Sequence, residues 1–208
     1  MTNLDILIGT GNRGKVTEIK RALSGLPLNL HLITDFPTIT SPDESGDTYA
    51  ANAIIKAQSY AQQTGLWTLA DDSGLEVASL DGMPGVRSAR FGGEGLSDAN
   101  RTNLLLSELS TVDDSQRSAR FVCSMVIAKQ TSEVINVAHG ICEGSIAHAP
   151  SGDEGFGYDP VFIPVGYQTT FAEMPLSLKN TLSHRGKALA ATRQFLDQLF
   201  GNVGNTKL

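Results

Sequence analysis

A glycine-rich loop with a lysine lies near the amino end of the chain and could bind phosphate. It runs Gly9-Thr-Gly-Asn-Arg-Gly-Lys15 between a short apolar segment and a helical one. Glycines let the backbone approach a phosphate closely, amide N–H groups point at its oxygens, and the following helix start adds a partial positive charge. Because Lys15 adds a cation that a plain tight turn would not require, the loop indicates phosphate binding.

The loop alone leaves the phosphate compound open. Gly9, Gly11 and Gly14 fit the dinucleotide fingerprint, and Asp35 follows where an acidic ribose partner is expected. The same stretch is also a P-loop with Val16 in place of the Ser or Thr that holds magnesium. A Rossmann-type oxidoreductase and a non-catalytic nucleotide sensor therefore stay as alternatives, whereas Val16 disfavours a P-loop kinase.

Three acidic residues could hold a metal ion beside a bound phosphate. Asp71 and Asp72 follow the β-compatible segment 67–70, and Glu44 lies in an acidic loop. Phosphoryl and nucleotidyl transfer usually need magnesium held by oxygen ligands, which these carboxylates could supply. Because neighbouring residues of a strand face opposite sides, we expect one of Asp71 and Asp72 to enter the site. Solvated turn acids before Gly74 are the plain alternative.

The elements that would position these residues are those of an α/β fold. We expect strands at 4–8 and 28–33 around a helix at 16–23, then a long loop at 34–48. An Ala-rich helix at 49–63 and a strand at 67–70 would follow, delivering the two aspartates at the strand's carboxyl end. Ligands collect at that end of the strands in open α/β sheets.

The second half of the chain predicts a mixed sheet. We expect an irregular loop at 81–95, a helix from Ser97 to Leu109, a hairpin of strands 117–128 and 134–142, and a glycine-rich loop at 152–157. A last helix capped by Ser183 would carry a stripe of Leu189, Thr192, Leu196 and Leu199, with a frayed tail from Gly201.

Composition limits the classes of partner. With 208 residues and 40% hydrophobic content, the chain is expected to form a single domain over 1–208. No run reaches membrane-spanning length and residues 1–5 lack a signal-peptide pattern, so we expect a cytoplasmic protein. The net charge of -6 argues against nucleic-acid and anionic-membrane partners. Cys123 and Cys142 are expected to be buried thiols.

Four segments in order add a family resemblance: Thr10-Gly-Asn-Arg-Gly-Lys15, Ala70-Asp-Asp-Ser-Gly-Leu75, Phe156-Gly-Tyr-Asp-Pro160 and Ser183-His-Arg-Gly-Lys-Ala188. Together they closely resemble the inosine triphosphate pyrophosphatase family, whose members remove non-standard purine nucleotides. The likeness extends from Leu4 to the last helix and includes 52–56 and 84–90. It implies an elongated mixed β-sheet flanked by helices, two lobes around a central cleft, and commonly a homodimer.

The resemblance also implies a reaction and the residues that perform it. ITP, dITP and XTP would be hydrolysed with Mg²⁺ between the α and β phosphates, giving the monophosphate and pyrophosphate. The triphosphate would be bound by Lys56 and by the loop residues Thr10, Gly11, Asn12, Arg13, Gly14 and Lys15. Asp72 would accept a proton from water near the metal, with Glu44 as the partner metal ligand. Ala51 departs from the family pattern, in which many relatives carry an acid.

The base would be bound by a second set of residues: Ser73, Phe156, Gly157, Tyr158, Asp159, Lys179, His184 and Arg185. Phe156 can stack on a purine, and donors from His184 and Arg185 suit the 6-oxo group of hypoxanthine or xanthine. Adenine offers an amino donor at that position. A site built of donors would leave buried groups unpaired against adenine, which gives a physical basis for rejecting it.

Overall fold

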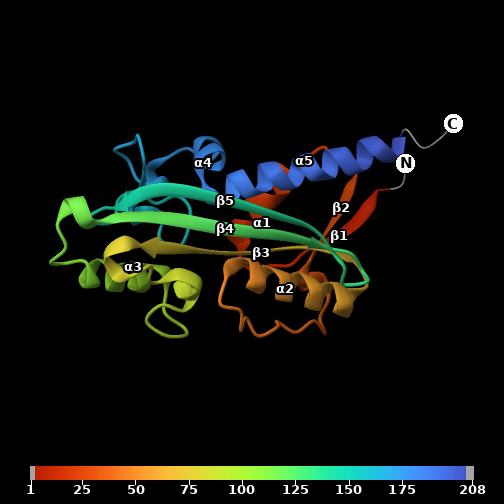
Figure 1. Cartoon of the computed structure of the whole chain (residues 1–208), viewed down its shortest axis with the longest axis horizontal. Coiled ribbons are helices and arrows are strands. Elements are labelled where there is room, and N and C mark those ends of the chain that lie inside the picture. Colours follow the sequence, from red (N-terminus) through yellow and green to blue (C-terminus); the bar gives the residue numbers. More distant parts are fainter. Residues whose placement is uncertain (1–2, 205–208) are drawn as a thin grey trace. The chain divides into compact units, whose positions relative to one another are not determined.

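The sheet of this chain is mixed, as the sequence predicted. The computed structural model describes residues 3–204. Its six-stranded sheet has the order β2-β1-β3-β4-β5-β6, in which β1 pairs in parallel with β2 and β3, and β5 pairs antiparallel with β6 (Figure 1). The strands are β1 (Leu4–Ile8), β2 (Leu28–Leu32), β3 (Trp67–Val77), β4 (Ser118–Ala128), β5 (Val134–Ile146) and β6 (Phe162–Pro164).

Five α-helices accompany the sheet within the described part of the chain. They are α1 (Arg13–Ala22), α2 (Tyr49–Thr64), α3 (Asp98–Glu108), α4 (Leu176–Leu182) and α5 (His184–Gly204). Caps explain where several of them begin and end. Thr48 and Ser97 accept from the third backbone N–H of α2 and α3, and Gly65, with a φ of 68°, ends α2. Between residues 3 and 204, none of these helices is long and apolar enough to cross a membrane.

The residues divide into two compact units. The first contains the chain up to Asp72, 123–139 and the part from Gly186 onward, and the second contains 73–122 and 140–185. Two units agree with the two lobes that the family resemblance implies. A single domain over 1–208 remains a prediction, and so does a central cleft.

In the first unit, strand alternation separates two cores. Ile6, Ile8 and Leu69 join residues of β4 in the core against α1 and α5. Ala70 joins Val126 and Ala128 in the core against the alanines of α2. Figure 1 shows α5 and α2 on opposite sides of these strands. Consecutive residues of β3 therefore point to different helices, as the period of a strand requires.

In the second unit, the core is aromatic. The Phe121 and Phe162 ring centroids lie 4.6 Å apart, and those of Phe162 and Phe171 lie 5.1 Å apart. Leu105 of α3 and Leu109, which caps the end of this helix, belong to the same cluster, so α3 is anchored by its apolar face. The stripe predicted on the last helix is also confirmed in the first unit, because Leu189, Thr192 and Leu196 of α5 are buried and Leu199 packs against the core.

Several expected element bounds were wrong. Helix α1 begins at Arg13 instead of residue 16, because the Asn12 side chain caps it by accepting from the Lys15 N–H. Strand β3 runs to Val77 and contains the aspartates, whose carboxylates are paired with Lys15 and Lys56. Strand β6 and helix α4 were not predicted, and β5 continues to Ile146 instead of ending at 142. Helix α5 is regular to Gly204, so the tail predicted as frayed from Gly201 is helical as far as the structure describes it, and 205–208 lie outside the described residues.

One buried arginine joins the ends of several elements in the second unit. Arg117 is 3% exposed and its guanidinium donates to the carbonyl oxygens of Leu109, Ile146 and Ala147 at 2.8, 2.8 and 2.9 Å. Backbone carbonyls without a partner are costly in a protein interior. Arg117 therefore connects the end of α3 to the start of β4 and the end of β5.

Replacing Arg117 with Met is expected to lower the free energy of unfolding by about 3 kcal/mol, because three buried hydrogen bonds from its guanidinium are lost. Urea denaturation followed by far-UV circular dichroism measures the change. Arg120→Met is the matched control, because Arg120 forms a half-exposed pair with Glu76 and the expected cost is about 0.5 kcal/mol. Equal losses in the two variants would contradict the role given to Arg117.

Candidate active site

The two consecutive aspartates of β3 each hold a lysine, on opposite faces of the strand. Asp71 Oδ2 lies 2.9 Å from Lys15 Nζ of α1, and Asp72 Oδ1 lies 3.2 Å from Lys56 Nζ of α2. The expectation that the neighbours face different sides is confirmed. The pairing of Asp71 with a lysine of the predicted phosphate loop was not predicted.

The glycine loop leads directly from β1 into α1. The Gly9 N–H donates to the Leu69 carbonyl at 2.7 Å, and a Cβ on Gly9 would lie 3.0 Å from Tyr60, so a close approach requires glycine there. Gly11 has no positive φ, and a Cβ on it would meet nothing within 4 Å among the described atoms. Neither packing nor backbone conformation accounts for Gly11. Open space beside it is what the approach of a phosphate would need.

The loop residues have distinct places. Asn12 caps α1 through the Lys15 N–H, and the Asn12 N–H donates to Thr10 Oγ1 at 3.3 Å. Gly11, Asn12 and Arg13 are exposed, whereas Gly14 and Lys15 are half-buried in the first turn of α1. The predicted phosphate residues therefore form a helix amino terminus with an adjacent ammonium, an arrangement that favours anions.

A buried cluster of opposite charges lies on the α2 side of β3. Lys56 Nζ is 3.2 Å from Glu44 Oε2 and 3.2 Å from Asp72 Oδ1. Asn52 donates to Asp72 Oδ2 at 3.2 Å and accepts from the Gly46 N–H at 2.8 Å. The structure thus brings together three predicted residues, Glu44, Lys56 and Asp72, and adds Asn52. The signal for Asn52 in the sequence is its position four residues before Lys56 in an Ala-rich helix, which places both on one face.

Glu44 reaches this cluster from a loop that lies along α2. Going forward along the loop and backward along the helix, the contacts are Thr40 with Gln63, Ser41 with Tyr60, Glu44 with Lys56, and Gly46 with Asn52. A Cβ on Gly46 would lie 2.7 Å from the Ala51 Cβ, so the loop touches the start of α2. The long loop predicted at 34–48 is therefore ordered by the helix that follows it.

Burial and the shared ammonium determine the charges of the cluster. Burial raises the pKa of Asp72, and the neighbouring carboxylate of Glu44 adds to this, while Lys56 and Lys15 oppose it. Burial would lower the pKa of Lys56, but the carboxylates of Asp72, Asp71 and Glu44 outweigh it, so the pKa is raised and the lysine stays protonated. Burial therefore decides the direction for the Asp72 carboxylate, and the surrounding carboxylates decide it for the Lys56 ammonium.

The donor set fits a magnesium ion that is bound together with a nucleotide. Among residues 3–204, no group of three or more His, Cys, Asp or Glu side chains is placed to hold a metal ion. Glu44 and Asp72, however, approach the same ammonium, so their oxygens are already gathered around one positive charge. Magnesium usually takes one or two carboxylates plus substrate phosphates and waters, which matches this pair.

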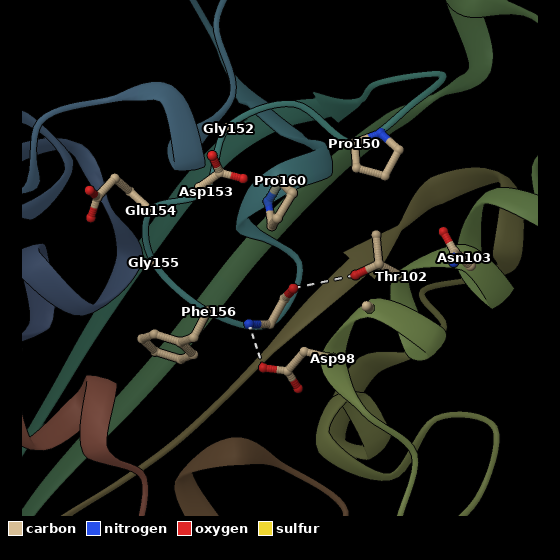
Figure 2. A pocket seen from close by; sticks show the side chains of 12 residues that line it. Asp98, Thr102, Asn103, Pro150, Gly152, Asp153, Glu154, Gly155, Phe156 and Pro160 are labelled. Atoms are coloured by element: carbon tan, nitrogen blue, oxygen red, sulfur yellow. Dashed lines mark hydrogen bonds between the residues drawn. The ribbon is translucent and has the colours of Figure 1, made fainter.

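The second unit gathers residues predicted to bind the base. Asp159 Oδ2 accepts from the Phe156 N–H and from Lys179 Nζ, both at 2.7 Å. The Phe156 ring, labelled in Figure 2, has Lys179 Nζ at 4.9 Å and Arg185 Cζ at 5.3 Å from its centroid. Arg185 also donates to Ser73 Oγ at 2.9 Å. An aromatic ring and two cationic donors therefore lie together.

Two further predicted base residues are held inside the second unit. The His184 ring stacks on Phe121 with centroids 4.5 Å apart and 9° between the planes, and His184 is 4% exposed. Tyr158 donates its hydroxyl to the Ser88 carbonyl at 3.0 Å, and burial raises its pKa, so it stays a neutral donor. Both side chains have a structural partner besides any nucleotide.

Comparison with known proteins gives the family. Residues 6–195 match the Ham1 family. The chain therefore belongs to the Ham1 family. The Ham1 chain is 44% identical over 197 residues to a dITP/XTP pyrophosphatase of Desulforamulus reducens, covering 95% of this chain and 98% of that protein. It is 46% identical over 186 residues to a dITP/XTP pyrophosphatase of Nostoc, covering 89% and 91%.

Solved structures agree with this membership. A HAM1 protein from Coxiella burnetii matches with a TM-score of 0.85 and 40% identity, covering 94% of this chain and 99% of that one. The Staphylococcus aureus Ham1 protein matches with a TM-score of 0.82 and 34% identity, covering 93% and 98%. The family resemblance and the α/β fold drawn from the sequence of this Ham1 chain are both confirmed.

The position of Asp35 in this Ham1 chain does not support the alternative of a Rossmann-type dinucleotide-binding site. Asp35, the expected ribose partner, accepts from the Leu32 N–H at 2.8 Å and stabilises a short 3-10 turn at Ile33–Asp35. The two cysteines, Cys123 and Cys142, are buried thiols as expected, and neither forms a disulfide within the described residues.

Replacing Asp71 with Asn is expected to lower the free energy of unfolding by about 2 kcal/mol, because Lys15 loses its buried partner while remaining partly exposed itself. Thermal and urea denaturation measure the change. Glu133→Gln is the matched control, since it makes the same acid-to-amide change in an exposed pair with Lys129, and a much smaller effect is expected. A loss no larger than that of the control would show that the Lys15–Asp71 pair does not contribute.

Proposed function

We propose that this chain hydrolyses dITP, XTP and ITP to the nucleoside monophosphate and pyrophosphate, and so removes these nucleotides from the pool. Relatives named dITP/XTP pyrophosphatase, with 44% and 46% identity over most of the chain, support the reaction class. The observation that carries the proposal for this chain is the buried Asp72 carboxylate, oriented by Lys56 and Asn52 beside the second carboxylate Glu44.

The triphosphate would bind to the first unit. Amide N–H groups at the start of α1 and the Lys15 ammonium would hold the β and γ phosphates, which become the leaving pyrophosphate. Lys56 would add positive charge nearer the reacting phosphorus. Asp71 would act as a positioning residue, because it fixes the Lys15 ammonium at 2.9 Å.

Asp72 would act as the general base. Its carboxylate accepts a proton from a water molecule, whose oxygen bonds to the α phosphorus while the bond from that phosphorus to the bridging oxygen breaks. Pyrophosphate leaves with the bridging oxygen, and the proton passes from Asp72 to solvent. Asn52 and Lys56 keep the two oxygens of Asp72 in fixed directions during this step. Held by Glu44 and Asp72, magnesium would neutralise phosphate charge and lower the pKa of the attacking water.

Selection of the base would depend on the second unit. A purine that stacks on Phe156 would lie near the donors of Lys179 and Arg185, which suit a 6-oxo group. Ser73, Gly157, Tyr158, Asp159 and His184 complete the proposed set. Adenine presents its own amino donor there and would leave charged donors unpaired.

Two wider parts of the proposal are supported by the family resemblance and composition: a homodimer and a cytoplasmic location. Light scattering during size-exclusion chromatography tests the first, since a mass near one chain would contradict it.

The central test is product analysis. Incubation with ITP and Mg²⁺ is expected to give IMP and pyrophosphate, separated by anion-exchange chromatography. Asp72→Asn is expected to lower kcat by at least about 100-fold while the fold is kept, because the change preserves size but removes the proton acceptor. Circular dichroism of the variant provides the control for folding.

Three outcomes would contradict the proposal. IDP and orthophosphate as products would mean cleavage at the terminal phosphate. Tight ITP binding without products in the presence of Mg²⁺ would indicate a nucleotide sensor. Full activity of Asp72→Asn would show that Asp72 is not the general base.

Metal dependence gives a separate prediction. Chelation with EDTA is expected to abolish ITP hydrolysis, and added Mg²⁺ to restore it. Glu44→Gln should raise the Mg²⁺ concentration for half-maximal rate about tenfold or more, because one anionic ligand is lost. Glu154→Gln changes an exposed acid of the second unit and serves as the control, with no expected change. Activity that survives EDTA would contradict a metal requirement.

A further inference from the structure

Helix α3 holds the backbone N–H and the backbone carbonyl of Gly157 through two side chains in its first turns. Asp98 Oδ2 accepts from the Gly157 N–H at 2.9 Å, and Thr102 Oγ1 donates to the Gly157 carbonyl at 3.3 Å. Figure 2 shows both bonds, one on each side of the same residue. The donor and the acceptor of Gly157 are thus both used by one helix, and we call this pair of contacts the α3 clamp.

The loop before Phe156 is fixed at its start, where the Thr170 hydroxyl donates to the Ser151 carbonyl and the Glu154 N–H donates to the Ala172 carbonyl, and the clamp holds its other end. Residues 151–155, immediately before Phe156, are exposed, and Gly152 and Gly155 have φ values of 84° and 82°. Gly157 itself has a φ of 62°. A cavity of about 340 Å³ lies between this loop and the start of α3, lined among others by Asp98, Thr102 and Phe156 (Figure 2). Without the clamp, the Gly157 end of the loop would have room to move relative to α3.

The helix that carries the clamp is itself well anchored. Leu105 and Leu109 lie in the aromatic core of the second unit, and the Ser97 side chain caps the helix by accepting from the Asn100 N–H at 3.2 Å. Arg101 donates to Asp98 Oδ1 at 2.9 Å, which leaves Oδ2 directed at Gly157. The position of the clamp is therefore set by the core and not by the loop.

Phe156 immediately precedes Gly157 in the chain, and Asp159 lies two residues after Gly157. Asp159 receives both the Phe156 N–H and Lys179 Nζ, so a shift of the Gly157 peptide would move the aromatic ring relative to its cationic neighbours. Misplacement of a binding group by about 1 Å can cost as much as about 100-fold in rate.

We propose that Asp98 and Thr102 are positioning residues for base selection: by holding Gly157 they keep Phe156 and Asp159 where a 6-oxopurine is preferred over adenine. This inference rests on the proposed function and deepens it. Neither residue is expected to contact the nucleotide. Asp98 also suits the start of a helix electrostatically, so the test must separate positioning from helix stability.

The experiment compares kcat and KM for ITP and ATP in wild type and variants. Asp98→Ala is expected to raise KM for ITP about tenfold, the effect of losing one hydrogen bond to a charged group, with kcat within about twofold. The ratio of kcat/KM for ITP over ATP should fall by a similar factor, because ATP does not use the oxo-selective contacts. Asp98→Asn keeps an acceptor oxygen and should recover most of the ratio. Thr102→Val should lower the ratio, and Thr102→Ser should preserve it.

Ser97→Ala is the matched control. It removes the cap of the same helix, and so lowers thermal stability, but leaves both clamp bonds in place. Its KM and ITP preference should match wild type. The proposal fails if Asp98→Ala and Thr102→Val keep wild-type KM and preference, or if Ser97→Ala reproduces their losses.

Failure of the proposed function would be seen separately. If wild type releases no pyrophosphate from ITP, that function is wrong, and calorimetric affinities for ITP and ATP then replace the kinetic ratio. The same loss of preference in Asp98→Ala would still support the clamp, and an unchanged preference would overturn it. Should Asp98→Ala not fold, Thr102→Val decides by the same criteria.

Discussion

The alternation of side chains along β3 is the constraint on which the first unit depends. Residues 69 to 72 point in turn to the core under α1 and α5, to α2, to Lys15 of α1 and to Lys56 of α2. Two adjacent carboxylates can be buried because each is directed to a different helix, and each helix supplies its own ammonium. Two carboxylates on one face would have competed for a single cation and repelled each other.

The same alternation divides the chemical tasks. The face toward α1 fixes the cation beside the glycine loop, and the face toward α2 orients the carboxylate proposed to accept a proton. The residue after Asp72 in β3 is Ser73, with which the second unit begins. Its hydroxyl oxygen accepts a hydrogen bond from Arg185. One strand thus carries residues of both the proposed phosphate set and the proposed base set.

Sequence patterns predicted what is local and missed what depends on distant neighbours. The limits of β1, α2 and α3 followed from apolar runs and caps such as Ser97 and Gly65, which act within a few residues. The full length of β3 could not be predicted from 67–77, because its two buried aspartates are paired with lysines of α1 and α2 that are far away in sequence. Asn52 and Asp98 were missed for the same reason: each bonds to a partner, Asp72 or Gly157, that is far away in sequence. The resemblance supplied Lys56 and Lys179, which no local pattern distinguishes from surface lysines.

The segment that carries Glu44 differs from an ordinary surface loop in one respect. Surface loops usually tolerate insertions and deletions, because their ends alone are fixed. Here Thr40, Ser41, Glu44 and Gly46 meet Gln63, Tyr60, Lys56 and Asn52 in matched order along α2. Losing or gaining one residue between 41 and 46 would move the Glu44 carboxylate away from the Lys56 ammonium. Evolution within this stretch is therefore expected to change residue identity while conserving length.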